Sequence, residues 1–238
     1  MQVRAVDADA RAGRRFAAAA AGLLLLVLAV GPLALLVHDR WAPLQSFDEA
    51  VSQGAERLVG ASPALLVAAR LVTHLGDPVG VTVASLVLVV ALLATGRRRM
   101  ALYVVAARFG AVLLSTGLKE VVGRARPLFE APVASAPGLS FPSGHALGGS
   151  AFWLSTAVVA VALLGHRRAW LAVAVGLSLL VAASRVLLGV HYLSDVLAGL
   201  VLGLGWVVVC TSLFSVWTAE ERGAPVPYEQ ALEPERRP

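Results

Sequence analysis

The chain has 238 residues, of which 58% are hydrophobic and only 15% are charged, and its mean hydropathy is +0.78. A soluble domain of this size could not bury so much apolar surface, so the composition predicts an integral membrane protein. The formal net charge of +5 comes from arginines that fall between apolar runs and form no dense stripe with aromatic residues, so we expect no nucleic-acid partner. The single cysteine, Cys210, excludes an intramolecular disulfide.

Apolar runs of about 20 residues predict six membrane-spanning helices. The first is expected at 16–37; a cleaved signal peptide is the alternative, but the length of the run and the lack of an A-x-A site favour a retained anchor. Residues 38–75 mix charged and apolar side chains and predict short amphipathic helices at the membrane surface. The other spans are expected at 79–95, 101–118, 145–165, 169–188 and 191–217, with a Pro-rich loop at 128–141.

The predicted fold is therefore all-α, a six-transmembrane helix bundle with short extracytoplasmic amphipathic helices. We divide the chain into a cytoplasmic N-terminal segment (1–15), one six-span domain (16–217) and a polar, disordered cytoplasmic tail (218–238). With both termini in the cytoplasm, the basic clusters fall on the inner side, as the positive-inside rule requires: these are Arg11, Arg14 and Arg15, then 97–99, then Arg167 and Arg168, and finally Arg222, Arg236 and Arg237.

Three polar motifs lie beside these spans, and the six-span plan places all of them at the same, extracytoplasmic face of the cell membrane. Ionisable groups beside membrane-spanning stretches are costly and usually functional. The motifs are Lys119-x6-Arg126-Pro127, then Pro142-Ser143-Gly144-His145, and then Ser184-Arg185-x5-His191-x3-Asp195.

The cations and small residues of these motifs have the chemistry of a phosphate site. Arginine offers a planar fork of donors and lysine a compact charge for the oxygens of a phosphoryl group, which assigns this role to Lys119, Arg126 and Arg185. Ser143 offers a hydroxyl, and Gly144 allows its backbone N–H to approach closely. The Pro142–His145 turn is expected to open a helix, where free N–H groups attract anions.

The two histidines supply the groups that hydrolysis needs. If residues 191–195 are helical, Asp195 lies one turn from His191 and can hold one imidazole nitrogen while the other attacks phosphorus. His145 remains to protonate the leaving oxygen. No carboxylate cluster is placed to hold magnesium, so we expect metal-independent chemistry without a cofactor.

In this order and spacing, the three motifs resemble those of the type 2 phosphatidic acid phosphatase superfamily, a group of membrane lipid phosphate phosphatases. The motifs cover residues 119–195, and the six-span plan extends the resemblance to 16–217. It implies an all-helical fold, a phosphohistidine intermediate at His191, and His145 as the acid. The same constellation occurs in soluble vanadium-dependent haloperoxidases, but the membrane spans argue against that activity.

Some residues keep more than one interpretation. Arg124 either adds a phosphate contact or faces lipid headgroups, and Ser184 is a possible auxiliary residue. Arg108 falls within the third span and needs a partner that the sequence does not identify. Asp77, before Pro78, is most simply a helix-start signal.

The expected function is hydrolysis of a lipid phosphate or diphosphate held in the bilayer. Undecaprenyl diphosphate, phosphatidylglycerol phosphate and phosphatidic acid are the substrates that the resemblance suggests, since the composition points to a bacterium. A phosphotransferase that uses the same histidine is the first alternative. A non-catalytic lipid-phosphate binder or transporter is the second, although binding alone would need only the cations. The sequence leaves the lipid and the oligomeric state open.

Overall fold

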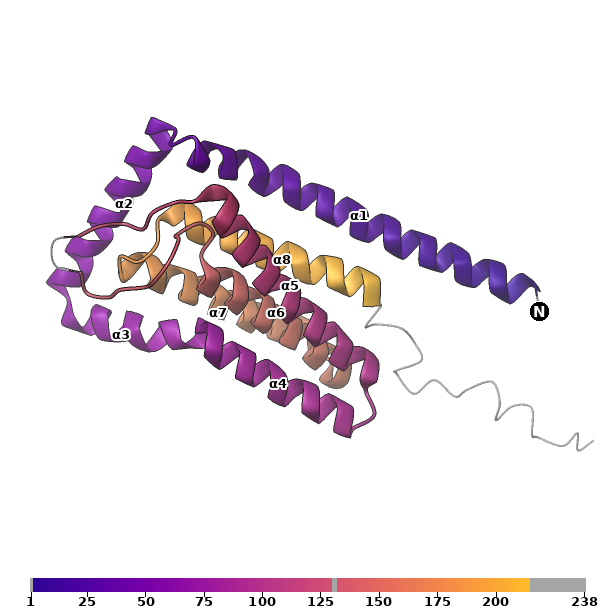
Figure 1. Ribbon diagram of the computed structural model, residues 1–238. Helices are drawn as coiled ribbons and strands as arrows, with labels where there is room; N and C mark the ends of the chain where they lie inside the picture. Colours follow the sequence, from indigo (N-terminus) through magenta and orange to yellow (C-terminus); the bar gives the residue numbers. More distant parts are fainter. Residues whose placement is uncertain (1, 130–131, 215–238) are drawn as a thin grey trace, which may run out of the picture.

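A computed structural model describes the backbone of residues 2–129 and 132–214, with side chains from residue 13 onward. The helices in chain order are α1 (Gln2–His38), α2 (Ala42–Ala61), α3 (Pro63–Thr73), the 3₁₀ turn η1 (His74–Gly76), α4 (Pro78–Ala94), α5 (Arg98–Val122), α6 (Gly144–Leu164), α7 (Arg167–Leu187) and α8 (Leu193–Phe214). The described residues contain no strand, which confirms the all-α prediction. Helices α4–α8 form a bundle, α1 runs along α8, and α2 and α3 form an arm across one end (Figure 1).

Five of the described helices are long and apolar enough to cross a membrane: the part of α1 from Gly13, and α5, α6, α7 and α8. The predicted second span, α4, is apolar but has 17 residues, which is the lower end of the range for a transmembrane helix. The bent pair of α2 and α3 also passes this test if it is counted as one span, so the described residues contain five or six candidate spans. The predicted tail at 218–238 and the last residues of the sixth span lie outside the described residues.

The arm has the amphipathic character that the sequence predicts for residues 38–75. Along α2 the buried residues recur at helical spacing, so one stripe faces the protein: Asp48, Ser52, Ala55 and Val59. The Ser62 hydroxyl accepts the Leu65 N–H and Pro63 starts α3, so the chain breaks at this point and bends by 115°. The bend turns α3 back toward the start of α4.

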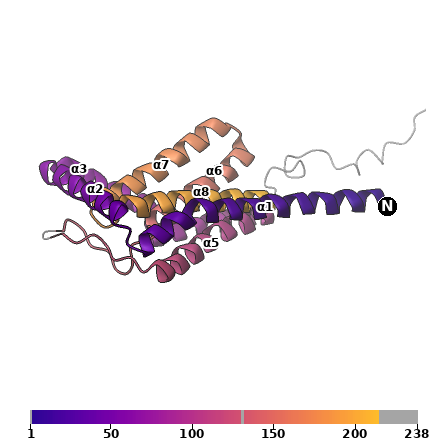
Figure 2. The same ribbon diagram turned by 90° about the horizontal axis from the view of Figure 1, so that it is seen from above.

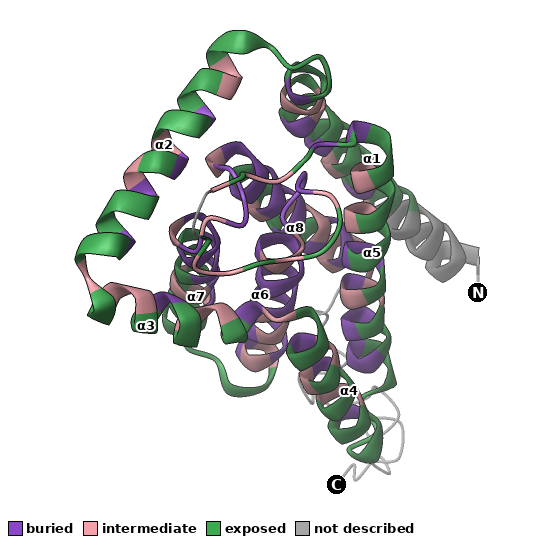
Figure 3. Cartoon of the chain, turned by 60° about the vertical axis from the view of Figure 1, so that its left-hand side comes forward, coloured by how far each residue is buried: buried purple, intermediate pink, exposed green. Residues whose placement is uncertain are grey.

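Helix α6 lies in the middle of the bundle and is buried along most of its length (Figure 3). Gly199 and Gly203, four residues apart on α8, allow the backbones of α6 and α8 to touch. A Cβ atom at Gly199 would lie 2.8 Å from Ser143 O, just before α6, and a Cβ atom at Gly203 would lie 2.8 Å from Leu147 O in α6. Small residues at this spacing are typical of close helix pairs in membranes. The contact fixes the start of α8 against the start of α6, where two of the motifs lie.

The two ends of the bundle carry different elements of the chain. The start of α1 and the turn between α4 and α5 lie at the end opposite to α2 and the long loop at 123–143 (Figure 1). Seen from above, α2, α3 and the loop again project together beyond the bundle (Figure 2). The polar motifs belong to this second end.

Candidate active site

The three motifs meet at the end of the bundle that carries the arm. Lys119 is in the last turn of α5, Ser143 precedes α6, Arg185 is in the last turn of α7, and His191 lies between α7 and α8. Main-chain and side-chain hydrogen bonds tie them together: Ser143 N–H donates to Asp195 O at 3.0 Å, and Arg126 contacts His191. Residues from four helices and two connections therefore surround one site.

The end of α5 explains how the first motif reaches this site. Gly123 adopts a left-handed conformation (φ 65°) and its N–H donates to Lys119 O, which is a common way to end a helix. A residue with a Cβ would be strained there. After Gly123 the chain leaves the helix axis, and Arg126 crosses toward the α7–α8 connection.

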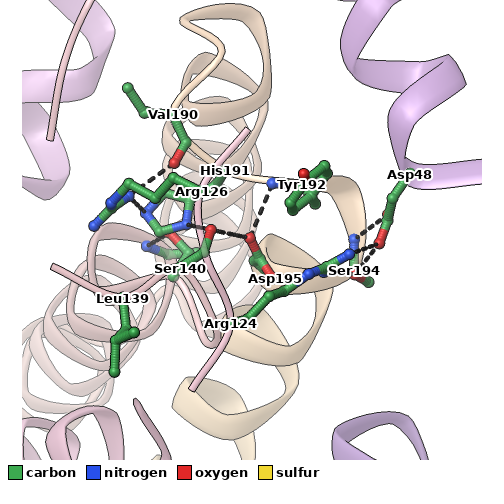
Figure 4. Close-up of polar contacts among 12 residues, drawn as sticks. Asp48, Arg124, Arg126, Leu139, Ser140, Val190, His191, Tyr192, Ser194 and Asp195 are labelled. Carbon is green, nitrogen blue, oxygen red and sulfur yellow. Dashed lines mark hydrogen bonds and ion pairs between the residues drawn. The ribbon is translucent and has the colours of Figure 1, made fainter. Parts of the chain in front are cut away.

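The contacts of His191 assign its tautomer. Arg126 Nη1 lies 2.9 Å from His191 Nε2. Arginine can only donate, so Nε2 accepts this bond with its lone pair and the ring proton resides on Nδ1. The Nδ1–H then faces the Ser140 hydroxyl at 3.3 Å and an Asp195 carboxylate oxygen at 3.5 Å (Figure 4). The imidazole is held neutral, with the lone pair of Nε2 toward Arg126.

Asp195 reaches His191 by a route that differs from the expected helical turn. Helix α8 begins at Leu193, so His191 precedes it and the expectation that 191–195 is one helical segment was wrong. Asp195 Oδ2 instead turns back over the helix start, where it accepts the Tyr192 N–H at 2.9 Å and the Ser140 hydroxyl at 2.5 Å. These bonds fix the carboxylate beside Nδ1, and the predicted pairing of His191 and Asp195 is present.

Burial sets the charge of the His191 side chain. The His191 side chain is 2% exposed. Burial lowers its pKa to about 4, and the charges of Arg126 and Arg185 act in the same direction, while the bond and charge of Asp195 oppose the shift. His191 is thus neutral throughout the neutral and mildly acidic range.

Three cations line the space beside His191. Arg126 is anchored by the Pro137, Gly138 and Val190 carbonyls, and Lys119 donates to the Leu139 carbonyl. Arg185 donates through Nη1 to the Thr73 hydroxyl at 2.7 Å. Its buried Nε has no hydrogen-bond partner among the described residues.

A buried donor without an acceptor is costly, and a phosphoryl oxygen would satisfy it. The orphaned Arg185 Nε therefore marks a place that suits an oxyanion. It lies on the same side chain that the third motif assigns to phosphate binding.

The second motif opens α6 as predicted. Ser143 is the N-cap residue, and its hydroxyl accepts the Ala146 N–H at 3.4 Å. Gly144 and His145 are the first two helical residues, where N–H groups have no intrahelical acceptor. His145 lies two residues after Ser143, whose N–H donates to Asp195 O, so the start of α6 brings it to the same end of the bundle as the other site residues.

Two residues have partners that the sequence did not indicate. Arg124 does not face lipid headgroups: it is buried and donates to Asp195 at 2.9 Å and Asp48 at 2.8 Å. The Ser184 hydroxyl donates to the Val181 carbonyl within α7, so we assign it no role in the site.

Arg108 has the partner that the sequence did not identify. It donates to the Thr82 hydroxyl at 2.7 Å and to the Pro78 carbonyl at 3.1 Å, both on α4. These bonds join α5 to α4, and we give Arg108 a structural role.

Sequence reasoning missed Ser140, Asp48 and Thr73. Ser140 stands three residues before the second motif, within the loop, and a search for a donor near the His191–Asp195 pair could have considered it. Asp48 had a signal too, since it falls on the apolar stripe of an amphipathic helix, where a lone carboxylate needs a buried partner. Nothing in the sequence pattern indicates Thr73.

Metal ligands are sparse in this site. In residues 2–129 and 132–214, no group of three or more His, Cys, Asp or Glu side chains is placed to hold a metal ion. The groups that face the site are instead cationic or histidine side chains. These suit the direct binding of an anion.

The family model described as PAP2 superfamily matches residues 100–219, about half of the chain, including all three motifs. The chain belongs to the PAP2 superfamily. The computed fold also matches the crystal structure of a transmembrane PAP2-type phosphatidylglycerolphosphate phosphatase from Bacillus subtilis, with a TM-score of 0.70 and 27% identity over 87% of this chain and 98% of that one.

Curated relatives agree with this family. The chain is 40% identical over 96 residues to phosphatidylglycerophosphatase B of Bacillus subtilis, which is 39% of this chain and 47% of that protein. It is 38% identical over 145 residues to decaprenylphosphoryl-5-phosphoribose phosphatase of Mycobacterium tuberculosis, covering 59% of this chain and 76% of the relative. It is 37% identical over 110 residues to lipid A 1-phosphatase of Rhizobium etli, covering 42% and 44%.

This PAP2 protein is a multi-pass membrane protein, and its relatives are phosphatases of lipid phosphates. The aligned part spans about half of the first of these relatives and of the lipid A enzyme. Their names differ in the lipid, while the phosphate chemistry is common to them.

Proposed function

We propose that this PAP2 protein is a phosphatase that removes a phosphoryl group from a membrane lipid through a phosphohistidine intermediate at His191. The observation that carries the proposal is the state of the imidazole: its Nδ1–H faces Asp195 and Ser140, and its Nε2 lone pair accepts a bond from Arg126. A neutral, oriented imidazole next to phosphate-binding cations is the arrangement that nucleophilic catalysis needs.

The first step forms a bond from His191 Nε2 to phosphorus and breaks the bond from phosphorus to the lipid oxygen. Arg126 occupies Nε2 in the free protein, so the substrate must draw this guanidinium onto a phosphoryl oxygen before attack. Lys119, Arg185, the Ser143 hydroxyl and the Gly144 N–H bind the other non-bridging oxygens and stabilise the charge that develops on them. His145 donates its proton to the departing lipid oxygen.

The second step restores the enzyme. Water attacks phosphorus, the bond to Nε2 breaks, and inorganic phosphate forms. His145, which lost its proton in the first step, accepts one from the attacking water. Throughout, Asp195 holds the Nδ1–H and balances the positive charge on the phosphorylated ring. No step in this scheme requires a metal ion.

The substrate class follows from the membrane setting and the relatives. Phosphatidylglycerol phosphate is the first candidate, because the structural match to a phosphatase of that lipid covers nearly all of that chain. Phosphatidic acid and undecaprenyl diphosphate offer the same phosphoryl group. The basic turn at 97–99 lies at the opposite end of the bundle from the motifs, which supports a cytoplasmic location for that end and an extracytoplasmic site.

Phosphate release tests the proposal. Purified protein in detergent is given phosphatidylglycerol phosphate, phosphatidic acid, undecaprenyl diphosphate and decaprenylphosphoryl-5-phosphoribose, with and without EDTA. We expect release from at least one lipid, unchanged by EDTA and abolished in a folded His191→Ala variant. Full activity in that variant would refute the mechanism. Release that appears only when an alcohol acceptor is present, with the phosphate recovered on the acceptor, would show a phosphotransferase instead.

A further inference from the structure

A buried charge cluster connects the arm to the catalytic pair. Arg124 lies between two carboxylates: its Nη1 donates to Asp195 Oδ1 at 2.9 Å and its Nη2 donates to Asp48 Oδ2 at 2.8 Å (Figure 4). Both carboxylates are fully buried, and Arg124 is 9% exposed. The Tyr192 ring covers the guanidinium, with 4.0 Å from Cζ to the ring centroid. We call Asp48, Arg124 and Asp195 the arm cluster.

Asp48 also holds the start of α8. Its Oδ1 accepts the Ser194 N–H at 3.0 Å, and its Oδ2 accepts the Ser194 hydroxyl. Asp48 comes from α2, so a residue of the arm caps the helix that carries Asp195. Asp48 is thus tied to the His191–Asp195 pair in two ways. It accepts the N–H of Ser194, the residue before Asp195, and it shares the Arg124 guanidinium with Asp195.

The charge balance of the arm cluster bears on catalysis. One cation lies between two anions, so the cluster has one net negative charge next to His191. His191 becomes positively charged when its Nε2 bonds to phosphorus while Nδ1 keeps its proton. A net negative cluster in a buried site stabilises that charge much more than a neutral one. Without Asp48, the charge of Arg124 would be matched by Asp195 alone and the cluster would be neutral.

We propose that Asp48 is a positioning residue for the phosphatase reaction, which holds Arg124 and the start of α8 so that the arm cluster keeps one net negative charge toward His191. This rests on the proposed function, because it assumes that His191 is phosphorylated. The arm is then a component of the active site, and its docking is coupled to turnover.

The test compares Asp48→Asn with Glu56→Gln, a control on the same helix. Glu56 is exposed and lies eight residues from Asp48, so Glu56→Gln removes the same charge from α2 outside the cluster. We expect Glu56→Gln to match the wild type. In Asp48→Asn, kcat should fall about 10- to 100-fold, as for other residues that orient a catalytic group. KM should change little, because the phosphate-binding cations are untouched.

A double variant separates charge balance from simple loss of structure. Asp48→Asn with Arg124→Gln removes one charge of each sign, so the cluster again has one net negative charge, on Asp195. We expect the double variant to have a higher kcat than Asp48→Asn alone, although it lacks more of the native bonds. Folded protein is quantified by gel filtration before each assay, so that kcat refers to folded enzyme.

The outcomes are distinct. An Asp48→Asn variant with wild-type kcat, or a double variant with a kcat no higher than that of the single variant, would overturn the inference. If Asp48→Asn does not fold, a folded double variant with a kcat more than about 100-fold below the wild type would overturn it as well. If the wild type itself releases no phosphate from any lipid, the proposed function has failed, and that result is seen before any variant is compared.

Discussion

The burial of His191 makes the acid side of the pH–activity profile a readout of the site. An ordinary histidine has a pKa near 6.5 and is mostly protonated at pH 5. Burial and the charges of Arg126 and Arg185 lower the pKa of His191 to about 4, against the opposing effect of Asp195. Because the pKa is lowered, the neutral nucleophile persists as the pH falls, and activity is lost only as the pH passes through about 4.

The size of the effect follows from the two pKa values. At pH 5, a group with a pKa of about 4 is about 90% neutral, whereas one with the ordinary value is roughly 3% neutral. The fraction of enzyme with a competent nucleophile therefore differs by about 30-fold between the two cases at that pH. Such a difference is far larger than the error of a kinetic measurement.

The assay is kcat/KM for phosphate release from pH 4 to pH 8, because this ratio reports the ionisation of the free enzyme. A lipid monophosphate and a lipid diphosphate are measured in parallel. If the acid limb reflects ionisation of the substrate, its apparent pKa differs between the two lipids; if it reflects ionisation of His191, the apparent pKa is the same for both. We expect a common acid limb near pH 4 for both lipids. A common acid limb near pH 6.5 would refute the description of His191 as a desolvated, neutral imidazole.

Other variants test separate parts of the structure. Ser140→Ala removes the hydroxyl that donates to Asp195 and faces the His191 Nδ1–H, and should lower kcat about 10-fold or more with little change in KM; an unchanged kcat would contradict its orienting role. Arg126→Lys loses the fork that binds carbonyls and His191, so kcat/KM should fall at least about 10-fold in the phosphate-release assay. Gly203→Ala places a Cβ 1.9 Å from a side-chain atom of α6 and should cost about 1–3 kcal/mol in stability. Gly117→Ala, with nothing within 4 Å, is its control, and equal melting temperatures would argue against the close helix contact.

The parts of the fold that depend on hydrophobic length and spacing could be predicted from the sequence. Apolar runs and basic clusters locate the spans, and the span plan predicts that the motifs of Lys119, Arg126 and His191 lie at one face of the membrane. Helix ends were less accurate: the chain at Tyr192 and Leu193 must turn so that Asp195 can accept a main-chain N–H, and the start of α8 shifts beyond His191. Local periodicity has no signal for such a cap.

Contacts between distant segments could not be predicted in this way. Arg124 lies within the first motif in sequence, and only the docking of α2 shows that its partners are Asp48 and Asp195. Ser140 was hidden in the same manner, because its role depends on how the loop at 123–143 folds over the α7–α8 connection. In both cases a polar side chain finds its partner through tertiary packing.

Trapping of the phosphoenzyme tests the central claim most directly. Purified protein is mixed with a lipid whose terminal phosphate is labelled with ³²P, quenched with alkali within milliseconds, and digested for peptide mapping. The account predicts an alkali-stable, acid-labile phosphate on the peptide that contains His191, and no label in His191→Ala. Rapid release of labelled phosphate from the wild type, without any protein-bound label on this peptide, would contradict it.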